Sequence, residues 1–181
     1  FAFFLSATAM IVTLVTYVGY TLTAPIIEQN RIDKINNNIA ILFDPEEGYI
    51  RNPEQKENSY QEKRYKWLSE VYEVLNSDGE IHALIYNLTS QGRNGPVQVL
   101  IAVDPYTDVV MAVTFYNHIE TPNIGEKYTR EEEVEKLIGQ SVAIDVEVDV
   151  IANASTTWKA IEEMFNMIET HYSEQEVHIN G

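Results

Sequence analysis

The sequence predicts an α/β (α+β) fold, in which a single N-terminal transmembrane helix precedes one compact domain of strands and helices. No charged residue occurs between Phe1 and Ile27. The remainder, roughly 150 residues, is long enough for one hydrophobic core. Strand-like and helix-like hydrophobic periods both occur in it. We therefore expect an anchor at 1–27, a membrane-proximal helix and connecting loop at 28–60, and the compact domain at 61–181.

The apolar run from Phe1 to Leu22 is long enough to cross a bilayer, since about 20 helical residues span the hydrocarbon core. Its threonines can bond the carbonyls of their own helix, so they are compatible with insertion. Tyr17 and Tyr20 lie near one end, where interfacial aromatic residues are expected. A cleaved signal peptide is the alternative. A retained span is favoured, because this apolar run exceeds the core of a typical signal peptide.

The charge of the chain lies entirely beyond this span and sums to −16. An acidic domain is poorly suited to nucleic acid or to an anionic cytoplasmic leaflet, so no nucleic acid is expected as a partner. The lipid bilayer is the expected partner of the apolar run. Only Arg31 and Lys34 closely follow the span, which favours an extracytoplasmic domain. The absence of cysteine excludes disulfides, thiolate-bound zinc and cysteine-ligated iron–sulfur clusters. Redox chemistry here would need an organic cofactor.

The segments between the span and residue 116 can be assigned from their composition and period. Asp33 to Phe43 either continues the membrane helix or forms a short second helix, and Asp44 to Tyr60 has the composition of a connecting loop. Apolar spacing predicts a helix over Gln61–Asn76, which Ser77-Asp78-Gly79 ends. Three strands are predicted next, over Ile81–Leu88, Val97–Val103 and Val109–Tyr116.

The last third of the chain is predicted to form a helix, a strand and a second helix in this order. Thr129-Arg130-Glu131-Glu132 is a capping-box pattern, and its helix should end at Gly139. A period of two from Ala143 to Val150 predicts a strand with one apolar face. An amphipathic helix should follow, with one face formed by Trp158, Ile161, Phe165, Ile168 and Tyr172.

Three consecutive hydroxyl residues, Ser155, Thr156 and Thr157, open this last helix. A helix N-terminus exposes free N–H groups and the positive end of the helix dipole, which suits a phosphate. The alternative is that Asn153 or Ser155 only caps an ordinary helix. A polar loop from His118 to Lys127 is a second candidate pocket, or simply a loop.

Taken in order, four segments resemble a known family. They are Gly92-Arg93-Asn94-Gly95-Pro96-Val97, Val99–Asp104, His118-Ile119-Glu120-Thr121-Pro122-Asn123-Ile124-Gly125, and Asp149–Thr157. The series is similar to the FMN-binding domain of RnfG, a subunit of the Rnf electron transport complex, and of its relative NqrC in the sodium-pumping NADH:quinone reductase. This resemblance covers about Ile81 to Phe165 and the anchor. It implies an FMN-binding-type domain with a mixed sheet and flanking helices.

The resemblance also implies roles for single residues. Ser155 matches the family threonine whose oxygen is esterified to the FMN phosphate, with Thr157 as the alternative acceptor, and non-covalent FMN is a further alternative. Asn153 and Asn123 stand where the family has glycine, a mild change because asparagine tolerates a left-handed backbone. The remaining members of the implied site are Ala154 and Thr156 beside the phosphate and Glu120, Thr121 and Gly125 beside the isoalloxazine ring. No metal ligand and no catalytic side chain is implied.

The function implied by the resemblance is that of a membrane-anchored flavoprotein. It would transfer electrons in an Rnf-type, ion-translocating ferredoxin:NAD oxidoreductase, with its soluble domain on the extracytoplasmic side of the cell membrane. Its partners would be the other membrane subunits and a flavin transferase. Two alternatives stay open: a flavin-free extracytoplasmic scaffold or binding module, and a membrane-anchored hydrolase using Ser155 with His118 or His171.

Overall fold

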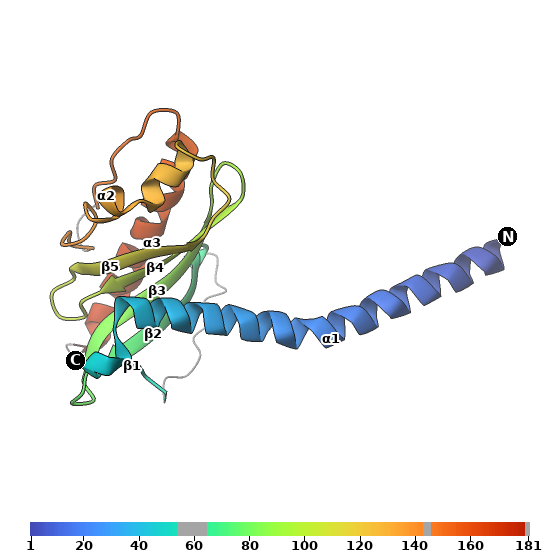
Figure 1. Cartoon of the computed structure of the whole chain (residues 1–181), viewed down its shortest axis with the longest axis horizontal. Coiled ribbons are helices and arrows are strands. Elements are labelled where there is room, and N and C mark those ends of the chain that lie inside the picture. The colour runs from blue at the N-terminus through green and yellow to red at the C-terminus, as the bar shows by residue number, and fades with distance from the viewer. Residues whose placement is uncertain (54–64, 143–145, 180–181) are drawn as a thin grey trace. The chain divides into compact units, whose positions relative to one another are not determined.

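The computed structural model describes residues 1–53, 65–142 and 146–179 (Figure 1). The chain divides into two compact units, Phe1–Asn37 and Asn38–Gly181. The predicted domain limits at residues 27 and 60 stay predictions, and the second falls outside the described residues.

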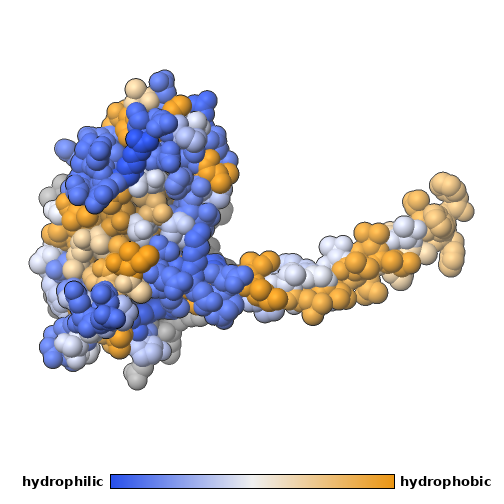
Figure 2. Space-filling model, in the orientation of Figure 1, coloured by the Kyte–Doolittle hydropathy of each residue, from blue (hydrophilic) through white to orange (hydrophobic). Residues whose placement is uncertain are grey.

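The N-terminal helix α1 (Ala2–Leu42) is 41 residues long, so of the two alternatives for Asp33–Phe43 the continuation of the first helix is the one observed, through Leu42. It is long and apolar enough to cross a membrane, and Figure 2 shows hydrophobic residues along its N-terminal part. Its hydroxyls donate to carbonyls of their own helix, as predicted; Thr13 bonds Ala9 and Thr16 bonds Val12, each at 2.9 Å. These side chains therefore bring no unsatisfied donor to the helix surface.

The second unit is built on one five-stranded sheet in the order β1-β2-β3-β4-β5. All of its pairings are antiparallel, so the expected mixed sheet is wrong. The physical reason is that short turns join β2, β3, β4 and β5 in sequence, and a tight turn can join only antiparallel neighbours. The strands are β1 (Ile50–Arg51), β2 (Leu68–Leu75), β3 (Ile81–Gln91), β4 (Pro96–Val103) and β5 (Val110–Asn117).

The three strands predicted between residues 81 and 116 are confirmed as β3, β4 and β5. The predicted helix over Gln61–Asn76 is wrong, because Leu68–Leu75 forms β2, while 61–64 lies outside the described residues. Apolar residues in this short run fit either period, and valine and tyrosine pack well in strands. Pairing with β3, for example Tyr72 with Ile85, decides in favour of the strand.

Short helices connect the larger elements: η1 (Pro45–Glu47), η3 (Gly125–Thr129) and α2 (Glu131–Val134). The helix predicted to run to Gly139 is regular only to Val134 and continues as turns. Thr129 is not its cap, since Arg130 holds the N-cap position and the Thr129 hydroxyl donates to the Glu126 carbonyl at 2.8 Å. The helix therefore begins one residue later than the capping-box pattern predicts.

The C-terminal helix α3 (Ser155–Ile179) lies across one face of the sheet (Figure 1). The predicted face is confirmed: Ile161, Phe165, Ile168 and Tyr172 are buried and Trp158 is partly buried. The strand predicted before it, over Ala143–Val150, is not formed in its described part. Residues 146–150 have no strand partner, and 143–145 lie outside the described residues.

Candidate functional site

The start of α3 is a helix N-terminus without a side-chain cap. The first helical bond runs from the Trp158 N–H to the Ala154 carbonyl, at 2.9 Å, which places Ala154 at the N-cap position. Alanine has no side-chain acceptor. Within the described part of the chain, no side chain accepts a bond from the N–H of Ser155, Thr156 or Thr157. The expected cap by Asn153 or Ser155 is therefore absent, and three N–H groups remain for an anion.

The three hydroxyl residues differ sharply in exposure. Ser155 and Thr156 are exposed, whereas Thr157 is 2 % exposed. The Thr157 hydroxyl donates to Oε2 of Glu120 at 2.5 Å. Only the first two hydroxyls are therefore open to a reagent.

Glu120 joins three separate segments. Its Oε1 accepts the Asn94 N–H at 3.1 Å, while its Oε2 accepts the Thr157 hydroxyl. The Asn94 side-chain amide donates to the Thr121 hydroxyl at 2.8 Å. The buried carboxylate of Glu120, in the loop after β5, thus bonds two other segments. They are the turn between β3 and β4 and the first turn of α3.

Glycine is required at two positions around this carboxylate. A β-carbon on Gly92 would collide with Oε1 of Glu120, and one on Gly125 would collide with Oε2 and lie 2.7 Å from the Thr157 hydroxyl. These contacts are closer than packed side chains allow. The sequence motif predicts that Gly125 borders a cofactor. In the structure, glycine is also needed at this position because there is no room for a β-carbon beside Glu120 and Thr157.

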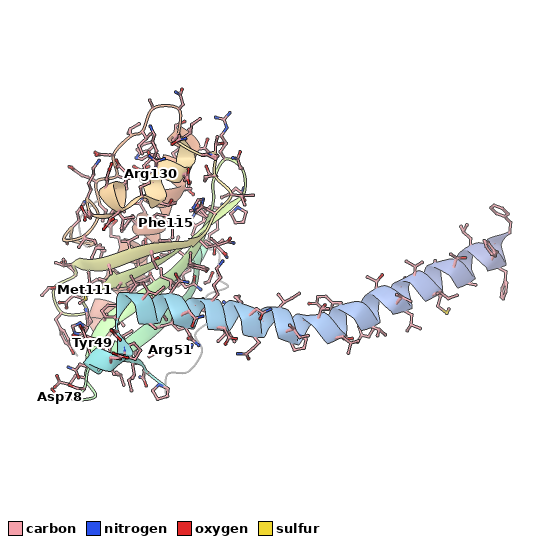
Figure 3. The ribbon with its side chains drawn as sticks, viewed as in Figure 1. Tyr49, Arg51, Asp78, Met111, Phe115 and Arg130 are labelled. Carbon is pink, nitrogen blue, oxygen red and sulfur yellow. The ribbon has the colours of Figure 1, made fainter. Side chains whose placement is uncertain are left out.

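The two asparagines that the sequence resemblance aligns with glycines do adopt a left-handed backbone. Asn123 has φ 60° and Asn153 has φ 68°. The Asn123 side chain accepts a bond from Arg130 at 2.6 Å, and the Asn123 N–H donates to Glu126 at 3.1 Å. Arg130 is labelled in Figure 3. The backbone shape expected of glycine is therefore kept.

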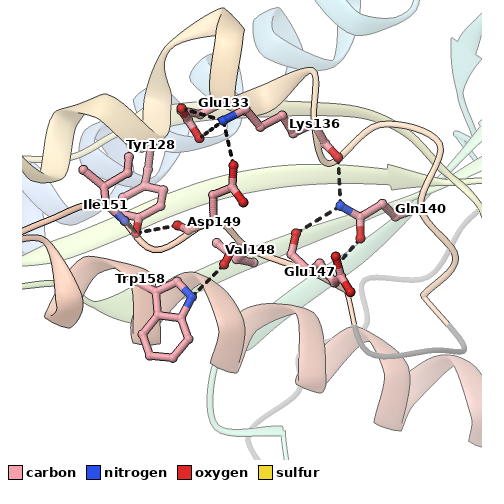
Figure 4. A network of polar contacts seen from close by, with 9 residues as sticks. All are labelled: Tyr128, Glu133, Lys136, Gln140, Glu147, Val148, Asp149, Ile151 and Trp158. Atoms are coloured by element: carbon pink, nitrogen blue, oxygen red, sulfur yellow. Dashed lines mark hydrogen bonds and ion pairs between the residues drawn. The ribbon is translucent and has the colours of Figure 1, made fainter.

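Side chains replace a partner strand along residues 146–151 (Figure 4). The Gln140 amide donates to the Glu147 carbonyl at 3.0 Å and accepts the Glu147 N–H at 2.8 Å. The Tyr128 hydroxyl donates to the Asp149 carbonyl at 2.8 Å and accepts the Ile151 N–H at 3.0 Å. The segment is thus held in an extended form without a strand beside it.

Two further contacts fix this segment. The Trp158 indole N–H donates to the Val148 carbonyl at 2.9 Å (Figure 4). Lys136 lies 2.8 Å from the Asp149 carboxylate and 2.9 Å from that of Glu133, and these two bonds raise the pKa of the Lys136 ammonium. Burial raises the pKa of the Tyr128 phenol, so it stays a neutral donor. Sequence reasoning missed Tyr128 and Gln140, for which no local pattern exists.

The structure brings most of the predicted site residues together. Asn153 to Thr157 form the turn into α3, and Glu120 and Gly125 lie against Thr157. Thr121 lies beside Asn94, in the same cluster. In the described part of the chain, Ser155 has no hydrogen bond to His118 or His171, so the arrangement lacks the base that a serine hydrolase needs.

The donor set fits a phosphorylated cofactor. Free N–H groups and two exposed hydroxyls at the positive end of a helix of 25 residues suit a phosphate ester. The roles predicted for the individual residues stay predictions.

Comparisons with known proteins agree with this chemistry. Residues 92–168 match the family described as FMN-binding domain, which here comprises β4, β5 and the first half of α3. No curated protein sequence matches the chain. Six solved chains match, among them the crystal structure of Shewanella oneidensis NqrC, with a TM-score of 0.53, 18% identity and 75% of each chain covered. The structural likeness shows a shared fold.

Proposed function

We propose that this chain is a membrane-anchored electron-transfer flavoprotein, with FMN tethered through its phosphate to Ser155. The observation that carries the proposal is an exposed hydroxyl at an uncapped helix start, inside a segment that matches the FMN-binding domain. FMN supplies redox chemistry that the side chains of this cysteine-free chain do not.

The chain's own residues would position the cofactor. The N–H groups of Ser155, Thr156 and Thr157 lie at the N-terminus of α3, where the helix dipole favours negative charge. They would bind the phosphate of the cofactor. The bond to Glu120 keeps the Thr157 side chain in the core. Ser155 lies two residues earlier on the helix, so its side chain points toward solvent. Ser155 is therefore favoured over Thr157 as the acceptor.

The assembly we propose is of the Rnf type, with the domain on the extracytoplasmic side and other membrane subunits as donor and acceptor. Support comes from the apolar N-terminal helix, the net charge of −16 and the few basic residues after the span. A flavin transferase would attach the cofactor. The ordered motifs of the sequence favour this assembly.

The test is intact mass spectrometry of the full chain, co-expressed with a flavin transferase and purified in detergent. The parent should carry one FMN adduct. Ser155→Ala should lose the adduct, because the acceptor oxygen is gone. Thr156→Ala should keep it, because the Thr156 hydroxyl is not the proposed acceptor. Thr156 is exposed like Ser155 and is therefore the matched control.

Two outcomes would contradict the proposal in different ways. An adduct that persists in Ser155→Ala and disappears in Thr157→Ala would support covalent FMN but show that Ser155 is not the acceptor. A folded parent with neither adduct nor bound flavin would favour a flavin-free module, a reading that Ala152-Asn153-Ala154-Ser155 also permits because it departs from the family motif.

A further inference from the structure

The turn between β3 and β4 contains an exposed asparagine that is followed by glycine, Asn94-Gly95. Asparagine is among the thermolabile residues of proteins. A following glycine makes it more reactive, because glycine has no β-carbon and restricts the backbone least. The only other such pair in the sequence, Asn180-Gly181, lies outside the described residues. Asn94 is therefore the asparagine of the described structure whose neighbour most favours reaction.

The two groups that would react are the side-chain carbonyl carbon of Asn94 and the main-chain nitrogen of Gly95. In the described part of the chain, the Gly95 N–H donates to no acceptor. Gly95 also precedes the first residue of β4, so no bond between strands holds its nitrogen in place. The nitrogen is therefore available as a nucleophile.

We propose that Asn94 is a site of spontaneous deamidation in the folded protein. The Gly95 nitrogen attacks Cγ of Asn94, so a C–N bond forms and the Cγ–Nδ2 bond breaks. The departing amide takes up the proton of the Gly95 nitrogen and leaves as ammonia, and a cyclic succinimide remains. Water then opens the ring at either carbonyl, which gives aspartate or isoaspartate. A neutral amide thus becomes a carboxylate, with water as the only co-reactant.

Two hydrogen bonds restrain Asn94 before the reaction. Its N–H donates to Oε1 of Glu120 at 3.1 Å, and its side-chain amide donates to the Thr121 hydroxyl at 2.8 Å. Because both bonds limit the approach of the side chain to the Gly95 nitrogen, conversion should be slower than in an unfolded peptide of the same sequence. The Thr121 hydroxyl can also donate to the carboxylate that replaces the amide, so the product fits the same place.

The modification would change the surroundings of Glu120, which is buried. Deamidation adds a negative charge to the residue whose N–H bonds this carboxylate, and like charges repel. Isoaspartate also lengthens the main chain between Asn94 and Gly95 by one carbon. The bond from the Gly92 N–H to the Gly95 carbonyl, at 2.9 Å, would then lose its geometry. The inference does not depend on a bound flavin.

The test is peptide mapping by mass spectrometry of the full chain, kept folded in detergent at mildly alkaline pH. We expect both aspartate and isoaspartate to accumulate at Asn94. Asn123 and Asn153 are internal controls, because they are also exposed but precede Ile124 and Ala154, and they should remain amides. An unchanged Asn94, when a peptide of the same sequence is converted in parallel, would overturn the inference. Equal conversion of the three asparagines would also overturn it.

Two variants test the chemistry at this pair. Asn94→Gln lengthens the side chain and disfavours ring closure, so the acid product at this position should be lost. Gly95→Ala keeps Asn94 but hinders the attacking nitrogen, so conversion should become several-fold slower. The added β-carbon would lie 2.5 Å from Cδ1 of Ile119, the end of a side chain that is 61 % exposed and has room to turn away. Unchanged conversion in Gly95→Ala would overturn the inference.

Discussion

At the residue scale, the molecule depends on a buried carboxylate, Glu120, which is 7 % exposed. Its donors are the Thr157 hydroxyl and the Asn94 N–H. A buried carboxylate that loses a donor is costly, because water cannot replace it. The contact therefore stabilises the first turn of α3 and separates Thr157, turned inward, from Ser155, turned outward.

Thr157→Val keeps the shape of the side chain and removes the hydroxyl. We expect the free energy of unfolding to fall by about 1–3 kcal/mol, since Glu120 is left with an unfilled acceptor. Urea denaturation of the detergent-solubilised chain measures the change. Thr156→Val is the matched control, because Thr156 is exposed, and it should change little. Equal effects of the two substitutions would refute the role of the Glu120 contact.

At the scale of elements, residues 146–151 show how side chains can replace a strand. Gln140 offers a donor and an acceptor, as a peptide group does, and pairs with Glu147. Tyr128 bridges Asp149 and Ile151. An extended backbone segment can thus be ordered without the hydrogen bonds of a neighbouring strand, provided that side chains bond its N–H and C=O groups. The result is one edge along which side chains bond the backbone groups of Glu147, Asp149 and Ile151.

Removal of the Tyr128 hydroxyl should loosen this segment. In Tyr128→Phe the Asp149 carbonyl and the Ile151 N–H each lose a partner, so we expect the Ile151 amide to exchange roughly tenfold faster or more. Hydrogen-exchange mass spectrometry resolves the segment. Tyr106→Phe, at a tyrosine that is 71 % exposed, is the control. Unchanged exchange in Tyr128→Phe would show that the bridge does not hold the segment.

At the scale of the whole molecule, an uncharged run at the start of α1 precedes a strongly acidic domain. The chain carries 28 acidic and 12 basic residues, all beyond the apolar N-terminal run. Exposed apolar residues along α1 suit a lipid environment, whereas the acidic domain is repelled by an anionic leaflet. This separation of charge favours a domain held outside the cytoplasm.

The side of the membrane can be tested through the lack of cysteine. Tyr106→Cys places a single, exposed thiol in the domain. We expect a membrane-impermeant maleimide to label it in intact spheroplasts as strongly as after lysis, because an extracytoplasmic thiol is accessible from outside. The parent chain, which has no thiol, gives the background. Labelling only after lysis would place the domain in the cytoplasm.

Much of the fold could be predicted from local patterns. The long apolar helix, β3 to β5 and the amphipathic face of α3 follow from hydrophobic runs and periods longer than one turn. The assignment of Leu68–Leu75 failed because eight residues with valine and tyrosine fit both periods, and pairing with β3 decided between them. The candidate site was predicted as a set of motifs, but Tyr128 and Gln140 act through contacts that no local pattern records.

The sequence by itself determined the apolar span, the acidic domain, the hydroxyl cluster at the start of α3 and the motif order of an FMN-binding domain. These depend on composition and on neighbours along the chain. Only the tertiary structure decided that Thr157 is buried while Ser155 is exposed. The reason is geometric: successive helical residues point about 100° apart, and the packing of α3 on the sheet selects which of them faces inward.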